Sequence, residues 1–450
     1  MVRILALSLA LIMAGCHPIS TDPGLAFMDV QENVCDRSGE HVEWTSRYYH
    51  SCEVKDLINS MLDDSLTLDQ VLYIVLLNNP KLQAIYEEIG ISQAQLVQAS
   101  LLKNPVLSLS LRFSSGFDYI IESGLLQDFL DILLKPAKRK LARAELEITK
   151  LKVTGEILQI IAQTEIAFHS LRKEIEILSL QREITDAYDA SGKFAKRLHQ
   201  AGNVTDLFLS IEESKSKQAQ IDQIAQELHV IKETERLNVL MGLEQGACLT
   251  LSDDHFIFQD TLESEDALQL KAIAASIDLQ ILQLKMRSLA LEAGITINET
   301  VFQKFELGPD VERKESGVWY LGPQLGIGIP LFDFGYAKSA EFKAKLKQLC
   351  HKSSAHAVKL CSEVRLAHFY LINSQEKFHI AQELIPLAEK TTEETLRQTN
   401  AMQVGVFELL QTKQRELVAK QQAVHSMKEI LIAKTNLELL LRGKMWENND

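Results

Sequence analysis

Residues 322–333 read Gly322-Pro323-Gln324-Leu325-Gly326-Ile327-Gly328-Ile329-Pro330-Leu331-Phe332-Asp333, a strand-like stretch that leads into about 65 residues of helical pattern. The first half of the chain carries a weaker copy, Leu125-Leu126-Gln127-Asp128-Phe129-Leu130-Asp131, which also precedes a long helical run. Each run is followed by a turn and by a second helix that stops at a glycine, Gly242 or Gly443. We interpret the chain as a two-fold internal repeat, with copies over 66–260 and 261–443 and a tail over 444–450.

The composition favours long helices and argues against nucleic acid as a partner. The chain has 450 residues, of which 46% are hydrophobic and 24% charged, with 9 prolines and 20 glycines. So few helix breakers favour long uninterrupted helices. The net charge of −14 opposes binding to a phosphate backbone. We interpret the basic run Lys135-Pro136-Ala137-Lys138-Arg139-Lys140, which acids flank, as a solvated helix start.

Residues 1–15 have the pattern of a signal peptide. Arg3 precedes a short apolar run, which ends in small residues before Cys16 and is too short to span a membrane. The stretch Met13-Ala14-Gly15-Cys16 resembles the bacterial lipobox, so Cys16 is the candidate lipidation site. The alternative is ordinary cleavage nearby, with Cys16 as a bystander. His17 stands where an aspartate would favour the inner membrane, so we expect the outer membrane.

The remaining cysteines do not predict a metal site. Cys35 and Cys52 lie in an irregular part of an exported chain, so both a disulfide between them and free thiols remain open. Cys350 and Cys361 lie about 16 Å apart along one predicted helix, too far for a bridge. No CxxC pair exists, and we expect neither a metal nor a cofactor.

The first half reads as an arm, a helix and a strand pair. We expect residues 16–65 to form a lipidated, extended arm docked on the body. A helix then starts after Thr67, the candidate N-cap, and continues to residue 102 with a break at Asn79-Pro80. A strand follows, in which Leu107, Leu109, Leu111 and Phe113 alternate with Ser108, Ser110 and Arg112. Residues 119–132 return as a second strand.

The second half predicts the same order less clearly. A helix covers about 263–291. Within residues 295–301, Ile295, Ile297 and Val301 alternate with Thr296, Asn298 and Thr300, which predicts a strand. Residues 306–317 are charged and contain glycine, which favours a long exposed loop. The last strand covers 321–329, with Gln324, Gly326 and Gly328 on its polar face.

The long helices show coiled-coil spacing. Leu410, Leu417, Val424 and Leu431 recur every seven residues. A helix of about 62 residues would be about 93 Å long, which exceeds an ordinary globular domain. Such helices must pack into a bundle or tube. A generic coiled-coil rod is the alternative, but it leaves the strands unexplained.

Four alternating strands in one chain have a consequence if they lie in a membrane. Inside lipid every backbone polar group must be paired, so an open sheet edge is not viable. About eight strands are the practical minimum for a barrel, so several chains would have to share one. The polar positions Ser108, Ser110, Arg112 and Gln324 would then face a wet lumen. The alternative is a small periplasmic sheet that caps a helical rod.

With these features, the chain resembles the TolC-type outer-membrane efflux factors over about residues 66–443. The best pieces are Leu76-Leu77-Asn78-Asn79-Pro80, Asn104-Pro105 and the stretch 322–335. The resemblance implies a mainly α fold with a small antiparallel β part. It also implies a homotrimer, in which four strands per chain build a twelve-stranded transmembrane β-barrel above a coiled-coil helical barrel. A periplasmic adaptor and an inner-membrane pump would feed this channel, which would be anchored in outer-membrane lipid and extend into the periplasm.

The resemblance also implies that two helix-turn-helix tips meet the adaptor and form the entrance. The candidate residues are Lys196, Arg197, Gly202, Asn203, Asp206, Gln403, Gly405 and Glu408. We expect Gly202 in a left-handed turn that is rebuilt at Gly405 in the second tip. Residues 396–406 contain no acidic side chain, so the aspartate ring of some family members is not carried over.

We find no constellation of catalytic residues. The chain has no HExxH, GxSxG or phosphate loop, and its twelve histidines are scattered. We therefore predict a non-enzymatic channel of a tripartite efflux or type I secretion system, gated by conformation. The alternative is a non-conducting periplasmic coiled-coil scaffold or adaptor lipoprotein. The substrate, whether drug, metal cation or peptide, is not readable from the sequence.

Overall fold

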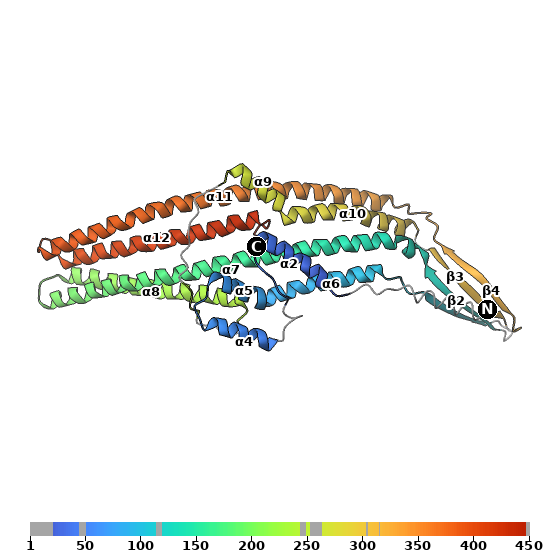
Figure 1. Cartoon of the computed structure of the whole chain (residues 1–450), viewed down its shortest axis with the longest axis horizontal. Helices are drawn as coiled ribbons and strands as arrows, with labels where there is room; N and C mark the ends of the chain where they lie inside the picture. Colours follow the sequence, from blue (N-terminus) through green and yellow to red (C-terminus); the bar gives the residue numbers. More distant parts are fainter. Residues whose placement is uncertain are drawn as a thin grey trace. The chain divides into compact units, whose positions relative to one another are not determined.

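The same order of elements occurs twice along the chain. In a computed structural model, residues 21–44, 51–113, 119–243, 249–252, 263–302, 305–314 and 316–446 are described, without the side chains of 51–53. After α2 (Gly24–Ser38) and α4 (Ser51–Leu62), each half has two helices, two strands and two longer helices (Figure 1). The first half comprises α5 (Leu68–Asn78), α6 (Pro80–Ser100), β1 (Val106–Phe113), β2 (Tyr119–Asp128), α7 (Phe129–Gln200) and α8 (Asp206–Met241). The second comprises α9 (Glu265–Ala275), α10 (Ile277–Val301), β3 (Phe305–Lys314), β4 (Trp319–Ile327), α11 (Tyr336–Asn400) and α12 (Val406–Leu441). A duplication of the sequence itself remains a prediction.

Both halves contribute to each of two compact units. The sheet unit contains Met1–Asn33, Ile85–Thr154 and Ile277–Ala357. The helical unit contains Val34–Ala84, Gly155–Ser276 and Val358–Asp450. The long helices α7 and α11 begin in the sheet unit and end in the helical unit. The predicted boundaries near residues 66 and 261 mark repeats in the sequence and do not coincide with these units.

The four strands form one antiparallel sheet in the order β1-β2-β3-β4. Because the strands alternate in direction, the start of β1, the end of β2, the start of β3 and the end of β4 lie at the same end of the sheet. The four strand ends that connect to helices therefore lie together, and the other four strand ends lie at the opposite end of the sheet. The outer edges of β1 and β4 pair with no further strand in the described part of the chain.

The strand predicted at residues 295–301 is wrong, because these residues form the last two turns of α10. Their apolar and polar side chains alternate, but Ile297 and Val301 also lie four residues apart and share a helix face. Both contact the turn at Gly335, where an added Cβ would lie 3.2 Å from the Ile297 side chain. Thr300 Oγ1 donates to the Thr296 carbonyl one turn earlier at 2.8 Å. Contacts with the rest of the chain therefore decide that residues 295–301 form a helix rather than a strand.

The loop predicted at residues 306–317 is also wrong, because most of it is the central strand β3. Gly308 and Pro309 disfavour a strand locally. In the sheet, an added Cβ at Gly308 would overlap the Leu125 backbone, so the missing side chain lets β2 and β3 approach closely. Pro309 lies opposite Pro323 of β4. Glu306, Asp310, Glu312 and Lys314 lie on one face of β3, but Arg313 lies on the other, so the strand read alone has no purely apolar face.

The arm predicted as extended is partly helical. Helix α2 buries Phe27, Val30 and Val34 along one face, at spacings of three and four residues. The Phe27 and Tyr86 rings meet edge to face, with centroids 5.1 Å apart. This apolar stripe fixes α2 as a helix.

The helical unit is a layer in which neighbouring helices are joined by polar contacts. Lys377 of α11 pairs with Glu429 of α12 at 3.1 Å, and Lys428 of α12 pairs with Glu174 of α7 at 2.5 Å. Ser191 of α7 donates to Glu212 of α8 at 2.6 Å. The lateral order is thus α11, α12, α7, α8, which places α11 and α8 at the two edges (Figure 1). The predicted heptad positions Leu417, Val424 and Leu431 are buried.

The ends of α8 and α12 cross earlier helices in the same way. Gly242 follows α8 with a φ of 68°, and an added Cβ would lie 2.6 Å from the Asn78 carbonyl oxygen. Asn78 and Asn79 donate to the last carbonyls of α8 at 2.8–3.0 Å. Gly443 follows α12 with a φ of 98° and lies against the Ala275 carbonyl. No asparagine is available beside Ala275, so the two crossings differ in their side-chain donors.

At the second crossing the donor comes from α2. Arg37 donates to the carbonyls of Ala275 at 2.8 Å and Arg442 at 2.6 Å. These carbonyls lie at the C-terminal ends of α9 and α12, where helical partners are missing. Arg442 in turn pairs with Glu165 at 3.1 Å. The N-terminal helix therefore completes a junction of the second half.

Candidate functional site: the sheet faces and the helical tips

One face of the sheet is apolar and exposed to a degree unusual for a folded chain. Odd-numbered positions of the four strands lie on this face, because side chains alternate along each strand. Leu107, Leu109 and Phe113 of β1 are 65%, 70% and 75% exposed, and Leu321 of β4 is 70% exposed. A contiguous apolar face of this kind indicates contact with lipid or another protein.

The opposite face is polar, and it carries the predicted lumen residues. Ser108, Ser110, Arg112 and Gln324 occupy even-numbered positions of β1 and β4. Arg112 pairs with Glu122 of β2 at 2.7 Å. An added Cβ at Gly124 would lie 2.9 Å from Ser108 Oγ and 3.2 Å from Gln324 Oε1, so these side chains converge over the glycine. The structure thus places the four candidates on one face, with Gly328 beyond the end of β4.

Aromatic side chains lie at both ends of the sheet. At the hairpin end, Arg313 lies 5.2 Å from the Trp319 ring and Lys314 lies 4.7 Å from the Tyr320 ring. At the helix end, the Phe129 and Phe305 rings meet at 5.8 Å. Aromatic residues at two levels that flank an apolar band are typical of membrane-spanning strands.

The first tip, between α7 and α8, has the predicted caps. Gly202 adopts a φ of 76°, and the amide of Asn203 donates to the Leu198 carbonyl at 2.8 Å. Thr205 then caps α8 by accepting from the amide of Phe208. These contacts form a Schellman-type stop followed by a helix start. Asp206 lies at the exposed start of α8 and contacts His199 at 2.6 Å.

The second tip corrects the prediction for Gly405. Gly405 is the N-cap of α12 with an ordinary φ of −84°, so it does not correspond to Gly202. The left-handed position is Met402, with a φ of 57° and a side chain that is 94% exposed. Its neighbour Gln403 donates to the Gln398 carbonyl at 2.9 Å, as Asn203 does in the first tip. A left-handed methionine is uncommon, and the glycine that normally marks such a position is absent there.

An aromatic cluster joins the two tips. Phe407 of α12 lies 5.3 Å from Phe194 of α7 and 4.8 Å from Phe208 of α8, between ring centroids. Lys196, Arg197, Gly202, Asn203, Asp206, Gln403, Gly405 and Glu408 are all exposed around it. The structure therefore brings all eight tip candidates to one end of the helical unit. Phe194 and Phe407 carried no signal in the sequence beyond an apolar position.

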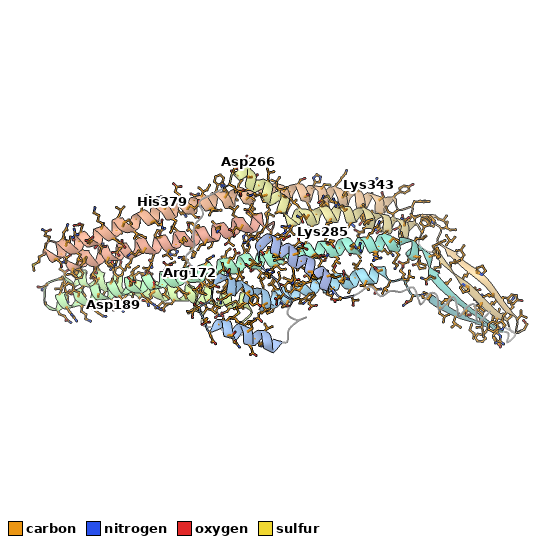
Figure 2. All side chains as sticks on the ribbon, in the orientation of Figure 1. Arg172, Asp189, Asp266, Lys285, Lys343 and His379 are labelled. Atoms are coloured by element: carbon orange, nitrogen blue, oxygen red, sulfur yellow. The ribbon has the colours of Figure 1, made fainter. Side chains whose placement is uncertain are left out.

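Ion pairs hold two carboxylates of α7 behind the tips, the buried Glu174 and the part-exposed Asp189. Burial alone would raise the pKa of Glu174, but hydrogen bonds from Lys428 and Gln226 outweigh it and lower that pKa. Hydrogen bonds from Lys193 and Ser216 lower the pKa of Asp189, which Figure 2 labels on α7. These carboxylates stay charged at neutral pH and are held in place.

The described residues contain no group of three His, Cys, Asp or Glu side chains placed to hold a metal ion. Among the described helices, none has a stretch that is both long and apolar enough to cross a bilayer. Cys16 lies outside the described residues. Cys35 is half-buried on α2, and the side chain of Cys52 lies outside the described part, so the disulfide stays a prediction.

No protein-family model matches the sequence, and no curated protein matches it. Solved structures do match. The CmeC outer membrane channel of Campylobacter jejuni has a TM-score of 0.70 at 14% identity, covering 85% of this chain and 87% of that one. The chain has the fold of an outer-membrane channel.

Two further channel structures agree. The outer membrane protein VceC of Vibrio cholerae has a TM-score of 0.66 at 14% identity, covering 84% of this chain and 97% of that one. The open MtrE outer membrane channel of Neisseria gonorrhoeae has a TM-score of 0.67 at 13% identity, covering 84% and 89%. The predicted resemblance to the TolC-type fold is confirmed, and these structural neighbours are channels rather than enzymes.

Proposed function

We propose that the protein is the trimeric outer-membrane channel of a tripartite efflux or secretion system and conducts its substrate passively. The observation that carries the proposal is the sheet, with an exposed apolar face, a polar face and two edges that pair with no other strand among the described residues. A membrane tolerates such strands only in a closed barrel. Joining β4 of one copy to β1 of the next would close three sheets into twelve strands, with the polar faces lining the lumen.

The edges of the helical layer support the same assembly. Helix α8 exposes an apolar stripe with coiled-coil spacing, formed by Ile221, Ile224, Leu228 and Ile231. Helix α11, at the other edge, exposes Ile380, Leu384 and Leu387. Two complementary edges on opposite sides of one chain suit a closed ring of identical copies. A second copy would cover each stripe and so close the helices into a tube.

The tips are the part of the molecule that suits an adaptor. Their exposed residues gather at one end of the helical unit, and Leu207 and Met402 are apolar and 71% and 94% exposed beside Lys196 and Arg197. We propose that a periplasmic adaptor engages this end and opens it, with energy supplied by an inner-membrane pump. Lipidation at Cys16 would add an anchor in the outer membrane.

The test is conductance of purified protein in a planar bilayer. We expect trimers that insert and give steps of ion conductance. In Ile224→Asp/Ile231→Asp, charges on the α8 stripe should dissociate the trimer and abolish the steps. The matched control is Ser214→Asp/Ala225→Asp, which adds the same charge to an exposed neighbouring face of α8 and should leave both intact. A protein that is soluble and monomeric without detergent, and that gives no ion conductance in bilayers, would instead favour the non-conducting scaffold.

A further inference from the structure

The two helices that leave the sheet, α7 and α11, begin with strongly basic segments. Residues 129–143 contain five basic side chains and one acidic one, and residues 336–352 have the same balance. This contrasts with the net charge of −14 for the whole chain. Helices α7 and α11 follow the ends of β2 and β4, which lie at the same end of the sheet. The two basic segments therefore belong to one region of the sheet unit. A solvated helix start does not account for this coincidence.

Part of this charge is neutralised by neighbours. Lys138 contacts Asp131 at 2.9 Å and Glu299 at 2.7 Å. Lys338 and Lys345 both contact Glu341, at 3.0 and 2.8 Å. These pairs fix the first turns of the helices but leave other cations over.

Six cations of the two segments remain, and the four nearest the sheet are all exposed. Arg139 and Lys140 on α7, and Lys343 and Lys347 on α11, point to solvent and make no ion pair within the described residues. Figure 2 labels Lys343 near the start of α11. Lys343 and Lys347 are four residues apart and share a helix face. They lie about 10 and 16 Å along α11 from its first residue. We call these four side chains the basic collar.

An exposed apolar belt separates the collar from the sheet. The odd-numbered apolar face of β4 continues past the strand through Ile329, which is 73% exposed, and Leu331, which is 68% exposed. Phe332 is 98% exposed, and Phe334 and Tyr336 follow. On the other helix, Leu133 is 62% exposed ahead of Arg139. From β2 into α7, and from β4 into α11, the chain thus passes from a strand with an apolar face through exposed aromatic or aliphatic side chains to the cations.

This order matches the gradient of polarity at a membrane surface. Aromatic rings favour the boundary between acyl chains and headgroups, and Lys and Arg just beyond it attract anionic lipids. We propose that the basic collar binds the anionic headgroups of phospholipids in the periplasmic leaflet and so fixes the depth of the sheet. The proposal rests on the outer-membrane placement above. The apolar belt ahead of each cluster favours a lipid surface over a nucleic acid, which would need no such belt.

The experiment measures lipid preference in vesicles of phosphatidylcholine and phosphatidylglycerol in equal amounts. The full-length protein is reconstituted with a trace of spin-labelled phosphatidylglycerol or spin-labelled phosphatidylcholine. Electron paramagnetic resonance then gives the immobilised fraction of each probe. We expect a several-fold preference for the anionic probe that falls as salt is added. The preference should vanish in Arg139→Gln/Lys140→Gln/Lys343→Gln/Lys347→Gln.

Two controls separate lipid recognition from folding and from total charge. Arg139→Lys/Lys140→Arg/Lys343→Arg/Lys347→Arg keeps the charge and should keep the preference. Lys217→Gln/Lys232→Gln/Lys390→Gln/Arg415→Gln removes the same charge from exposed positions of the helical unit and should also keep it. Insertion without an anionic preference, or equal loss in the second control, overturns the inference alone. Failure to insert into these mixed vesicles overturns the channel proposal and the inference together.

Discussion

At the scale of single residues, the two tips solve the same turn with different side chains. Gly202 and Met402 both occupy a left-handed position after a long helix, and Thr205 and Gly405 both cap the next helix. A side chain in this region costs about 1–2 kcal/mol. The second tip therefore has local backbone strain that the first tip avoids. The strained residue is Met402, which is more exposed than the apolar Leu207 of the first tip.

The first prediction distinguishes these positions. Gly202→Val should distort the first tip, because a β-branched residue is strained at a φ of 76°. Gly405→Val should be tolerated, because φ is −84° there and no atom lies within 4 Å of an added Cβ. Trimer retention on gels and efflux in cells that carry the cognate pump provide the measurement. We expect intact trimers in both variants and reduced efflux in Gly202→Val alone; wild-type efflux in Gly202→Val would remove the tips as the adaptor site.

The second prediction concerns acid sensitivity at His169. Burial, and then the nearby cations Arg172, Lys173 and Lys434, lower the pKa of His169 from 6.5 to about 4. A lowered folded-state pKa gives stability that is present above pH 6.5 and is lost as the pH falls towards about 4. The loss from this group should be about 1–3 kcal/mol. The measurement is the denaturant midpoint of the helical signal above pH 6.5 and near pH 4. The difference between the two midpoints should be smaller in His169→Gln than in the unchanged protein. An equal difference in the two proteins would assign the acid sensitivity to other groups.

The role of a single residue could be predicted from the sequence where its hydrogen-bond partners lie within a few residues of it. Thr67 was predicted as an N-cap, and it forms a capping box with Gln70 three residues later. Gly202 followed from the same kind of reasoning. Met402 could not be predicted, because methionine has no preference for its left-handed backbone, which belongs to a turn closed by the bond from the Gln403 amide to the Gln398 carbonyl. The His199 to Asp206 contact was likewise missed, because it crosses a turn whose geometry had to be known first.

At the scale of elements, the strands that were predicted correctly have a single clear period. In β1, apolar and polar side chains alternate without exception from Leu107 to Phe113. In β3, Gly308 interrupts the charged face and Pro309 the apolar face, so the strand indicates a loop when it is read alone. The partner strands supply what the local sequence lacks, since β3 lies between β2 and β4. For the same reason, residues 295–301 were assigned the wrong period.

The third prediction tests the two faces of β1 with neighbouring positions. Arginine on a lipid-exposed face near the middle of a bilayer costs about 2–4 kcal/mol, whereas lumen positions tolerate charge. Leu109→Arg should therefore reduce assembly in the outer membrane, and Ser110→Arg should not. The measurement is the heat-modifiable trimer band from membrane fractions. Equal loss in both variants would contradict the assignment of the faces.

The fourth prediction concerns the junction held by Arg37. Arg37→Met should free the carbonyls of Ala275 and Arg442, so amide hydrogen exchange should rise at the ends of α9 and α12. Exchange at the end of α8 should not change, because Asn78 and Asn79 serve that crossing. The matched control is Glu32→Gln, at an exposed position of the same helix. Increased exchange at both crossings would point to global loosening instead.

At the scale of the whole molecule, the strand pattern of the sequence already favours an oligomer, because four membrane strands cannot close a barrel. The sequence does not reveal that each compact unit draws on both halves of the chain. Nor does it reveal that α8 and α11 are the edges of the helical layer, since this order depends on contacts such as Lys428 to Glu174 that span 254 residues. Long-range contacts of this kind leave no periodic signal.

The fifth prediction belongs to this scale, since it fixes where the molecule resides. Cys16→Ser should abolish fatty-acid labelling and slow signal processing, because the thiol is the proposed site of acylation. Labelling with a fatty-acid probe in cells, followed by fractionation, provides the measurement. Cys35→Ser serves as the control and should be labelled like the unchanged protein. Labelling that persists in Cys16→Ser would remove the lipoprotein assignment.

The bond from Arg37 to the Arg442 carbonyl joins positions 405 residues apart. A chain exported from its N-terminus delivers α2 first and the end of α12 last. The junction therefore stays open throughout translocation and closes only when the final turn of α12 has emerged, after the slow search that such a distant contact requires. A chain shortened before residue 442 would keep the bond from Arg37 to the Ala275 carbonyl but would lose the bond to Arg442. The bond to Arg442 can therefore form only in a chain whose α12 is complete.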